Sequence, residues 1–374
     1  MALLTKAPGI ESKFHIRIVS PEEVDQKLIA AWSDLEARAI EPNAFLSPYF
    51  VLPAIRHLEE DKHPLLVFVE SNSGENPTLK GFAIFNVHRP SRKFPLQHLV
   101  LFSSIHSYLD GFLVDRTCAA DVLHSIFSYI SEPGHGWHGI RFKMNPLSDE
   151  QDTVATELGM KWKIRKTWQR AIMHPGSAEM VLENLSKSLK RNYQRYTRAL
   201  QALGKLEWRM LQGRAVTPEM VSEFLRLEHM SWKGEGGTSL LSNPNQTEFF
   251  KEMVSGFNSE GRFYFTVLLL DEKPIAFTSN LISGSIGFGF KLCFDPAYAK
   301  YSPSIINLIE YCLHANDNLP GIDYVDSSAS PGSYMESVWQ DRRTLVDGYY
   351  SSTPVGRAAL SIAAAARSAK RLIH

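Results

Sequence analysis

Short apolar runs and helical apolar stripes alternate along the chain, and their order recurs. Residues 15–19 predict a strand. A helix follows, with a capping serine at Ser20, proline at its first position and an acid three residues on. Its apolar stripe comprises Val24, Leu28, Ile29, Trp32 and Leu35. In the second half, residues 206–211 predict a strand, and a helix starts at Thr217 with the stripe Val221, Phe224, Leu225 and Met230. Both halves therefore begin with the same pair of elements.

The correspondence continues to the end of each half. The paired predictions are second helices at 47–60 and 246–256, hairpin strands at 64–69 with 81–87 and at 263–270 with 275–282, strands ending in an acid at 111–115 and 291–295, helices at 119–130 and 303–315, and strands at 139–142 and 321–324. The paired elements give the order β-α-α-β-β-β-α-β, and with a final α-β the predicted order of each half is β-α-α-β-β-β-α-β-α-β. This order, with a central antiparallel run and one late β-α-β crossover, resembles the GNAT acyltransferase fold. Two unrelated α/β domains are the alternative.

We therefore expect a mixed α/β (α+β) chain of tandem GNAT domains, each a largely antiparallel sheet flanked by helices. The predicted boundaries are 1–173 for the first domain, 174–352 for the second and 353–374 for a basic amphipathic tail, with the join marked by Pro175-Gly176-Ser177. A length of 374 residues accommodates two such domains. Hydrophobic and charged contents of 44% and 21% are ordinary for globular proteins and exclude long disorder or coiled coil.

Charge and cysteine content narrow the function classes. The chain has 40 Lys and Arg against 40 Asp and Glu, so any polyanion site must arise from local clustering. The cysteines, Cys118, Cys293 and Cys312, are widely spaced and fit reduced core thiols, and no zinc-type grouping predicts a metal. The start of the chain lacks the apolar core of a leader, and no apolar run is long enough to span a membrane. We therefore expect a cytoplasmic protein.

Basic residues are clustered between residues 161 and 214, which hold thirteen Lys and Arg but only three Glu. Within this stretch, residues 186–203 predict a helix with the buried stripe Leu185, Leu189, Tyr193, Tyr196 and Leu200 and the outward cations Lys187, Lys190, Arg191, Arg195 and Arg198. Five like charges repel unless an anion binds, whereas a plain solvated face is the alternative. Coenzyme A phosphates, an acidic carrier protein, a tRNA acceptor stem and an anionic saccharide all remain open as partners.

Five short motifs stand out in the second half. They are, in chain order, Leu185 to Asn192 (LSKSLKRN), Glu228 to Lys233 (EHMSWK), Pro274-Ile275-Ala276, Phe294 to Pro303 (FDPAYAKYSP), and Asp323-Tyr324 before Tyr334 and Trp339. Over residues 185–350 they resemble the BioF2-like acetyltransferase family, which includes cellulose-biosynthesis-type acetyltransferases and is related to the Fem-type aminoacyl transferases. A weaker echo lies at residues 106–111. Two positions depart from the family pattern, with Ser304 in place of glycine and Met335 in place of lysine.

The resemblance implies acetyl-CoA or another acyl-CoA as co-substrate, with no permanently bound cofactor. In FDPAYAKYSP a strand ends and Pro303 starts a helix, whose first-turn N–H groups can bind phosphate. The expected donor-binding residues are Tyr298, Tyr301, Ser302, Pro303 and Ser304. An ordinary proline-initiated core helix is the alternative. The first domain lacks the Tyr-Ser-Pro element, so we expect it to bind no donor and to face the acceptor.

Acyl transfer needs a base for the attacking amine or hydroxyl and donors for the oxyanion. The catalytic candidates are Asp323, expected at the end of the splayed strand, Glu228, expected to face the acceptor cleft, and Asp110, reaching in from the first domain. Tyr108, Trp232 and Lys233 are the candidate acceptor-binding residues, and Tyr298 and Tyr301 could donate to the leaving sulfur. His135 and His138 are expected to be turn residues.

These residues favour an acyltransferase acting on an amine or hydroxyl of a sugar or polysaccharide precursor. The alternatives are Fem-type aminoacyl transfer from tRNA and a degenerate, non-catalytic GNAT binding module. The tail has four cations and no acid from residue 354 onwards, so its helix could contact an anionic membrane surface, dock on its own domain or fray.

Overall fold

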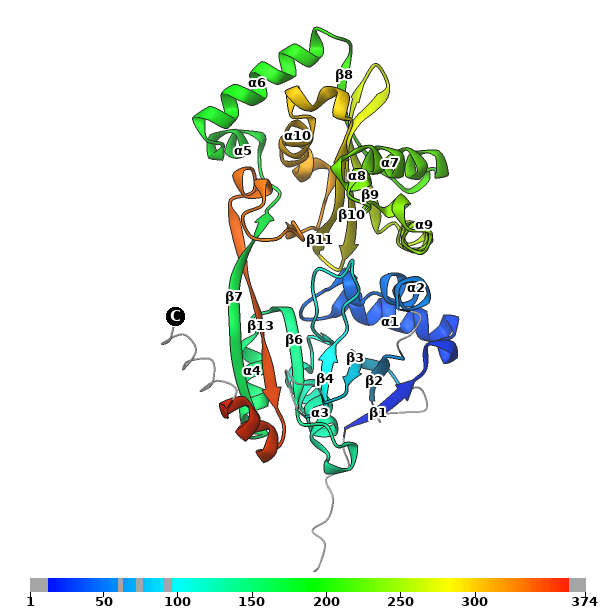
Figure 1. Cartoon of the computed structure of the whole chain (residues 1–374), viewed down its shortest axis with the longest axis vertical. Helices are drawn as coiled ribbons and strands as arrows, with labels where there is room; N and C mark the ends of the chain where they lie inside the picture. The colour runs from blue at the N-terminus through cyan, green and yellow to red at the C-terminus, as the bar shows by residue number, and fades with distance from the viewer. Residues whose placement is uncertain (1–12, 60–62, 72–76, 91–95, 363–374) are drawn as a thin grey trace, which may run out of the picture.

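The lower lobe of the protein in Figure 1 is built from the first part of the chain. The structure is a computed structural model that describes residues 13–59, 63–71, 77–90 and 96–362. The lobe's strands and helices are β1 (Phe14–Val19), α1 (Gln26–Arg38), α2 (Pro48–Leu58), β2 (Leu65–Ser71), β3 (Leu79–His88), β4 (His98–Leu101), β5 (Leu113–Val114), α3 (Ala119–Ser131), β6 (Ile140–Pro146), α4 (Asp149–Glu157) and β7 (Lys161–Met173).

The upper lobe follows. Its elements are α5 (Ala178–Asn184), α6 (Lys187–Gln201), β8 (Leu206–Gln212), α7 (Pro218–Met230), α8 (Trp232–Glu235), α9 (Pro244–Ser259), β9 (Phe263–Leu270), β10 (Lys273–Ser283), β11 (Ile286–Phe294), the 3-10 helix η6 (Pro296–Tyr301), α10 (Pro303–Asn318), β12 (Tyr324–Asp326) and the 3-10 helix η7 (Tyr334–Ser337). The last strand, β13 (Asp341–Ser351), returns to the lower lobe.

Both lobes have the same strand succession. In each, four antiparallel strands are followed by a fifth that runs parallel to the fourth: β1-β2-β3-β4 with β6, and β8-β9-β10-β11 with β12. One continuous sheet results, in the order β1-β2-β3-β4-β6-β13-β7-β12-β11-β10-β9-β8. The predicted tandem arrangement of mostly antiparallel sheets flanked by helices is confirmed.

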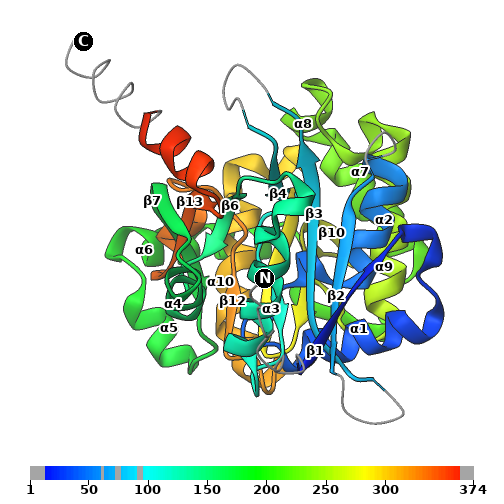
Figure 2. The same cartoon turned by 90° about the horizontal axis from the view of Figure 1, so that it is seen from below.

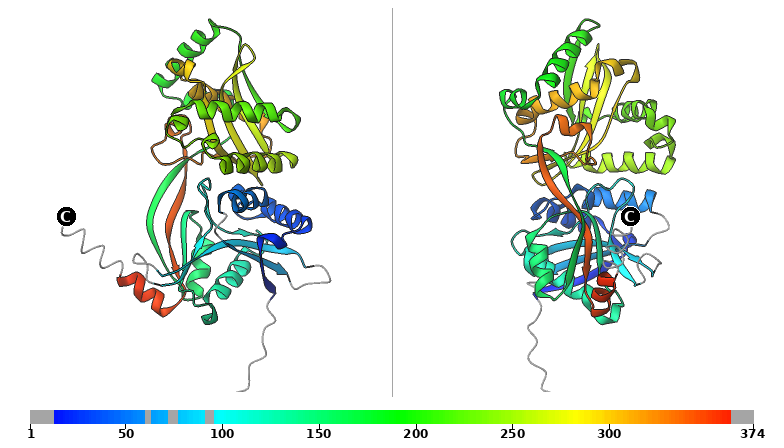
Figure 3. Two further views of the ribbon diagram at one scale, coloured as in Figure 1. Left: turned by 45° about the vertical axis from the view of Figure 1, so that its right-hand side comes forward. Right: turned by 60° about the vertical axis from the view of Figure 1, so that its left-hand side comes forward.

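Two long strands, β7 and β13, connect the lobes, because each of them extends from its own part of the chain into the sheet of the other lobe. β13, from the end of the chain, lies between β6 and β7 in the lower lobe, and all of its residues face β7 in antiparallel register. β7 continues upward, where Ile172 and Met173 pair with β12. The views in Figure 3 show this two-stranded ribbon passing from one lobe to the other.

The lobes also share one hydrophobic core. Helix α2 of the lower lobe packs against α9 of the upper lobe, where Phe50 and Phe249 are fully buried with ring centroids 5.3 Å apart. Apolar side chains of α1 and α7 belong to the same core. Figure 2 shows α2 beside α9 along this junction. The buried Glu36 of α1 pairs with Arg262 of the upper lobe. Apolar burial and a buried ion pair therefore fix the lobes to one another.

The structure corrects several predicted element bounds. Ser20 does form its capping box, but only on a three-residue 3-10 turn, and α1 begins later because Asp25 accepts the Leu28 N–H at 2.8 Å. The strand predicted at 111–115 reduces to β5, which pairs with β3, so the counterpart of β11 is the unpredicted β4. The strand predicted at 321–324 begins only at Tyr324. The long strands β7 and β13 were not predicted.

The first part of the tail docks on the lower lobe. Residues 354–362 are helical, Leu360 is buried, and Arg357 Nη1 donates to the Gly159 carbonyl at 2.7 Å. The rest of the predicted tail helix lies outside the described residues.

Candidate active site

A cavity of about 250 Å³ opens where β11 and β12 separate. The two strands pair in parallel only from Ile286 opposite Tyr324 to Phe288 opposite Asp326. Beyond that point β11 bulges, because Ser279 faces Lys291 and Asn280 faces Gly289, which leaves Phe290 without an opposite residue on β10. The lining residues are Tyr108, Thr278, Ser279, Asn280, Gly289, Phe290, Lys291, Leu292, Leu308, Tyr311, Ser327, Ser328, Ala329, Ser333, Met335 and Trp339.

Buried charges hold the β12 side of this splay. Arg343 Nη1 donates to Asp326 Oδ2 at 3.0 Å, and Arg170 lies on the other carboxylate oxygen, with Nη1 3.6 Å from Oδ1. The same Oδ1 accepts the Ser328 N–H at 2.7 Å, and the Ser328 backbone is left-handed, with φ +53°. The Ser328 hydroxyl is buried and makes no hydrogen bond within the described part of the chain. The splay therefore presents a fixed, unused hydroxyl to a ligand.

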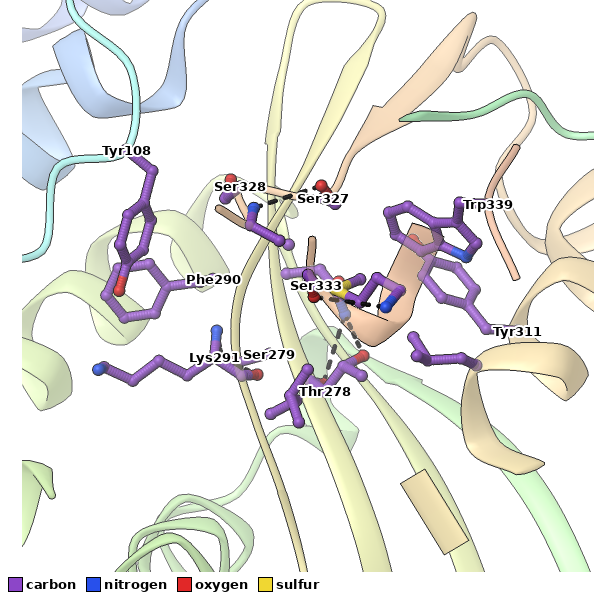
Figure 4. A pocket seen from close by; sticks show the side chains of 16 residues that line it. Tyr108, Thr278, Ser279, Phe290, Lys291, Tyr311, Ser327, Ser328, Ser333 and Trp339 are labelled. Atoms are coloured by element: carbon purple, nitrogen blue, oxygen red, sulfur yellow. Dashed lines mark hydrogen bonds between the residues drawn. The ribbon is translucent and has the colours of Figure 1, made fainter. Parts of the chain in front are cut away.

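Tyr108 reaches the cavity from the lower lobe. Its ring packs edge-on against Phe45 at 5.6 Å and lies 5.8 Å from the ring of Phe290 on β11. Figure 4 shows Tyr108 and Phe290 together at one end of the cavity. Burial raises the pKa of Tyr108 to about 12, and the nearby Glu228 carboxylate adds to this rise. At neutral pH the phenol therefore keeps its proton and can donate a hydrogen bond.

Glu228 is placed rigidly beside Tyr108 by α7. The side chain is fully buried, and its Oε2 accepts the Leu240 N–H at 2.8 Å. The Glu228 carboxylate lies within electrostatic range of Tyr108 across the lobe junction. Glu228 does not itself line the cavity, but its carboxylate can act as a proton acceptor for a group bound beside Tyr108.

The candidate donor segment lies at the start of α10. Asp295 caps η6 by accepting the Ala297 N–H at 2.9 Å, and Ser302 has a left-handed φ of +51° just before Pro303. Tyr298 and Tyr301 pack in one cluster with Tyr193 and Tyr196 of α6. The Ser304 hydroxyl is buried without a hydrogen bond to any described residue, and the Tyr334 phenol lies near it. Because Ser333 and Met335 flank Tyr334 and line the cavity, the helix start and the cavity adjoin.

The remaining predicted residues lie elsewhere. Asp323 precedes β12, at the opposite end of this strand from the splay, and its Oδ2 accepts from the Ser285 hydroxyl at 2.5 Å. Asp110 is buried against β6, where its Oδ2 accepts the Lys143 N–H at 2.5 Å. Trp232 and Lys233 begin α8, but their side chains lie outside what the structure describes. The structure thus brings together Tyr108 and Glu228 and places Asp323 and Asp110 away from the cavity lining.

Sequence reasoning missed much of the cavity wall. Phe290 and Lys291 lie on the bulge, and Ser327 and Ser328 lie just after β12. The pattern Gly287-Phe288-Gly289-Phe290 was the available signal, because glycine inside a strand often marks a bulge or a close backbone approach. Trp339 and Met335, both buried cavity residues, were noted only as part of the family motif.

The buried Asp110 makes one prediction about stability. Burial raises its pKa well above the usual value, and the Asp347 carboxylate adds to the rise. Stability from such a group is present below the unfolded pKa, about 4, and is lost as the pH rises through the folded pKa. The free energy of unfolding of Asp110→Asn, relative to that of the native protein, should therefore be higher at pH 8 than at pH 5. Urea unfolding at both pH values measures this, and a difference that does not change with pH would contradict it.

Comparisons with known proteins can now be set beside this geometry. Residues 187–333 match the family model described as the acetyltransferase (GNAT) domain. This segment is similar to a GNAT domain. It contains the α10 start, β11, β12 and most of the cavity wall. A search of curated proteins gives no match.

Solved structures share the fold across almost the whole chain. FemX is 9% identical, with 93% of this chain and 100% of that chain covered and a TM-score of 0.59. The C-terminal domain of a putative lysylphosphatidylglycerol synthetase from Agrobacterium fabrum is 12% identical, covers 89% and 93%, and gives a TM-score of 0.53. A conserved protein of unknown function from Bacteroides thetaiotaomicron is 12% identical, with 86% of this chain and 96% of that chain covered and a TM-score of 0.51. At these identities the likeness shows the fold.

None of the helices among the described residues combines the length and apolar character needed to cross a membrane. Within the same residues, no group of three His, Cys, Asp or Glu side chains is placed to hold a metal ion.

Proposed function

We propose that the protein transfers an acetyl or other acyl group from acyl-CoA to an amine or hydroxyl of a sugar or polysaccharide precursor in the cytoplasm, as a BioF2-like acetyltransferase. One observation carries the proposal: the β11–β12 splay joins the α10 start on one side and Tyr108 of the other lobe on the other. A thioester donor and an acceptor can therefore meet in one cavity. The similarity of residues 187–333 to a GNAT domain supports acyl-CoA as the donor.

The donor side has groups that suit a phosphate-bearing thioester. The first-turn N–H groups of α10 and the unused Ser304 hydroxyl would bind the pyrophosphate. The backbone of the bulge at Phe290 would donate to the thioester carbonyl, since it has no opposite residue on β10. In this proposal the donor contacts the upper lobe from the bulge at Phe290 to Ser304 at the start of α10, and η7 lies beside it.

The acceptor side supplies the base. Glu228 takes the proton from the acceptor amine or hydroxyl as that atom attacks the thioester carbonyl. Tyr108 keeps its proton and orients the acceptor by a hydrogen bond. The carbon–sulfur bond then breaks, and the leaving sulfur takes up the proton that Glu228 removed. The carboxylate is thereby regenerated.

Ser304→Glu tests the donor site. An acid is tolerated in a first helical turn but would repel the donor's phosphates, so acetyl-CoA should bind at least about tenfold more weakly with little change in melting temperature. Calorimetric titration measures the affinity. Asn245→Glu is the control for an acid added to a first helical turn, because Asn245 also follows a proline at the first position of a long helix, α9. Asn245 is exposed whereas the Ser304 hydroxyl is buried, so the melting temperatures of both variants are measured. Equal affinity of the native protein and Ser304→Glu would place the donor elsewhere.

The basic helix α6 favours a second candidate, Fem-type transfer of an aminoacyl group from tRNA. Its cations Lys187, Arg191, Arg195 and Arg198 are exposed, and the helix packs beside η6 at the donor segment. In the leading proposal these cations lie beside coenzyme A, or an acidic carrier protein. Tight, strongly salt-dependent binding of tRNA without any acyl-CoA binding would favour the second candidate. Acyl-CoA binding without turnover on any acceptor would indicate a non-catalytic module. Met335, which lines the cavity where the family pattern has lysine, would agree with that alternative.

A further inference from the structure

The basic stretch of residues 161–214 is divided by the fold between two separate surfaces. The α6 cations lie in the upper lobe beside the donor segment, whereas the first residues of β7 lie in the lower lobe (Figure 1). The donor site gives the first surface a role. The second surface has none in the proposed reaction.

The second surface is built around Tyr349 of β13. In register, Tyr349 faces Arg141 of β6 on one side and Lys163 of β7 on the other. The guanidinium carbons of Arg141 and Arg165 lie 5.9 and 5.7 Å from the Tyr349 ring centroid, and Arg165 Nη1 donates to the Tyr349 hydroxyl at 3.4 Å. Cation–π contacts of this kind hold the two guanidinium groups in place.

The surface extends by one further row of residues. Lys166 faces Asp347 in register and lies 5.0 Å over the Trp168 ring, and Lys143 follows Arg141 on the same side of β6. We call the five cations Arg141, Lys143, Lys163, Arg165 and Lys166 the basic face.

Two acids lie near the basic face: Asp347 faces Lys166, and the buried Asp110 lies beside Lys143. Within the described residues none of its five cations forms a salt bridge, whereas Arg38, Lys80, Arg209 and Arg343 elsewhere on the protein do. The Arg141 Nε–H is buried with no hydrogen-bond partner in this part of the chain. Grouped, pre-positioned cations with unused donors favour an anionic ligand.

Assuming the proposed transfer to a saccharide, we propose that the basic face binds the carboxylate groups of an anionic oligosaccharide acceptor. Arginine forks bind carboxylates in bidentate geometry. A nucleic acid fits less well, because the Tyr349 and Trp168 rings lie beneath cations and offer no free stacking surface. The chain also has equal numbers of acidic and basic residues, whereas nucleic-acid-binding domains are usually strongly basic.

The basic face and the active site lie on one side of the ribbon. Along β7, Lys163, Lys166, Trp168 and Arg170 share that side, with a bulge at Arg165. Arg170 in turn acts electrostatically on Tyr108, which lines the cavity. Seven residues of strand separate Lys163 from Arg170, roughly 23 Å, so the acceptor must be several sugar units long.

The test is direct binding of an oligogalacturonate of about ten units, measured by calorimetry on the full chain. We expect binding that weakens as salt rises and that falls at least tenfold in Lys163→Glu/Arg165→Glu. The fully methyl-esterified oligomer, which lacks the charges, should not bind. Arg191→Glu/Arg195→Glu on α6 is the matched control and should bind the oligomer as the native protein does. Melting temperatures check that each variant is folded.

Equal binding by Lys163→Glu/Arg165→Glu, or equal binding of the esterified oligomer, would overturn the proposal. Tighter binding of a hairpin RNA that the same variant loses would replace the glycan by a nucleic acid. Acetyl-CoA titration separates this proposal from the proposed function, because Lys163→Glu/Arg165→Glu should keep native donor affinity. Donor binding without oligomer binding refutes the basic face alone, and oligomer binding without donor binding refutes the proposed function alone.

Discussion

Glu228→Gln should lower kcat by about a hundredfold or more while the affinity for acetyl-CoA stays unchanged. Glutamine keeps the shape and can still accept the Leu240 N–H, so only the proton acceptor is lost. Steady-state kinetics with a saturating acceptor, together with donor titration, measure the two quantities.

Two comparison variants make this result specific. Asp323→Asn changes the other candidate base in the same conservative way, at a residue that precedes β12 and hydrogen-bonds to Ser285. If Asp323→Asn loses the rate and Glu228→Gln does not, the base is Asp323. Tyr108→Phe removes only the hydroxyl group and keeps the ring. It should mainly raise the KM of the acceptor, since the Tyr108 hydroxyl is assigned to orienting the acceptor.

A fragment of residues 174–352 should fail to fold, although it spans the second predicted domain. All eleven residues of β13 pair with β7, and Val325 and Asp326 of β12 pair with the end of β7. The fragment lacks β7, so it exposes both strands and leaves Asp326 without Arg170. Circular dichroism during heating should show no cooperative transition.

The matched fragment is 161–352, which adds β7 and restores both sets of pairs. It should regain a cooperative transition at a lower temperature than the full chain, because the edge of β13 that faces β6 stays open. A cooperative transition and native acetyl-CoA affinity in 174–352 would show that the second lobe is independent of β7.

The sequence predicted elements best where burial and capping agree. The strand at residues 263–270 is buried along its whole length, and α7 begins at its predicted Thr217 cap, which accepts the Met220 N–H. The cap at Ser20 was also real, but a better-placed cap at Asp25 starts α1. Local signals therefore locate elements, and competition between neighbouring caps decides their ends.

The parts that could not be predicted depend on long-range pairing. β7 combines apolar positions with many cations, so its composition suggested a basic stretch, whereas its extended form comes from pairing with β13 far along the chain. Glu228 and Tyr108 were predicted separately from motifs, and the shared core of the two lobes brings them within electrostatic range of each other. Asp323 was expected at the end of the splayed strand, but that strand, β12, begins at the next residue. A shift of this size moves a side chain to the other end of the strand.

The position of β13 also sets an order for biosynthesis. β6 has its partner β4 as soon as residue 146 has left the ribosome, but its other neighbour is not made until residues 341–351 emerge. At roughly 5–20 residues per second, the nascent first lobe waits on the order of ten seconds or more with an uncovered strand edge. Uncovered edges recruit other chains, so this interval is when the protein is most exposed to misassembly. Slowed translation of residues 174–340 should therefore lower the yield of folded protein, and coexpression of a chaperone that binds nascent chains should restore it.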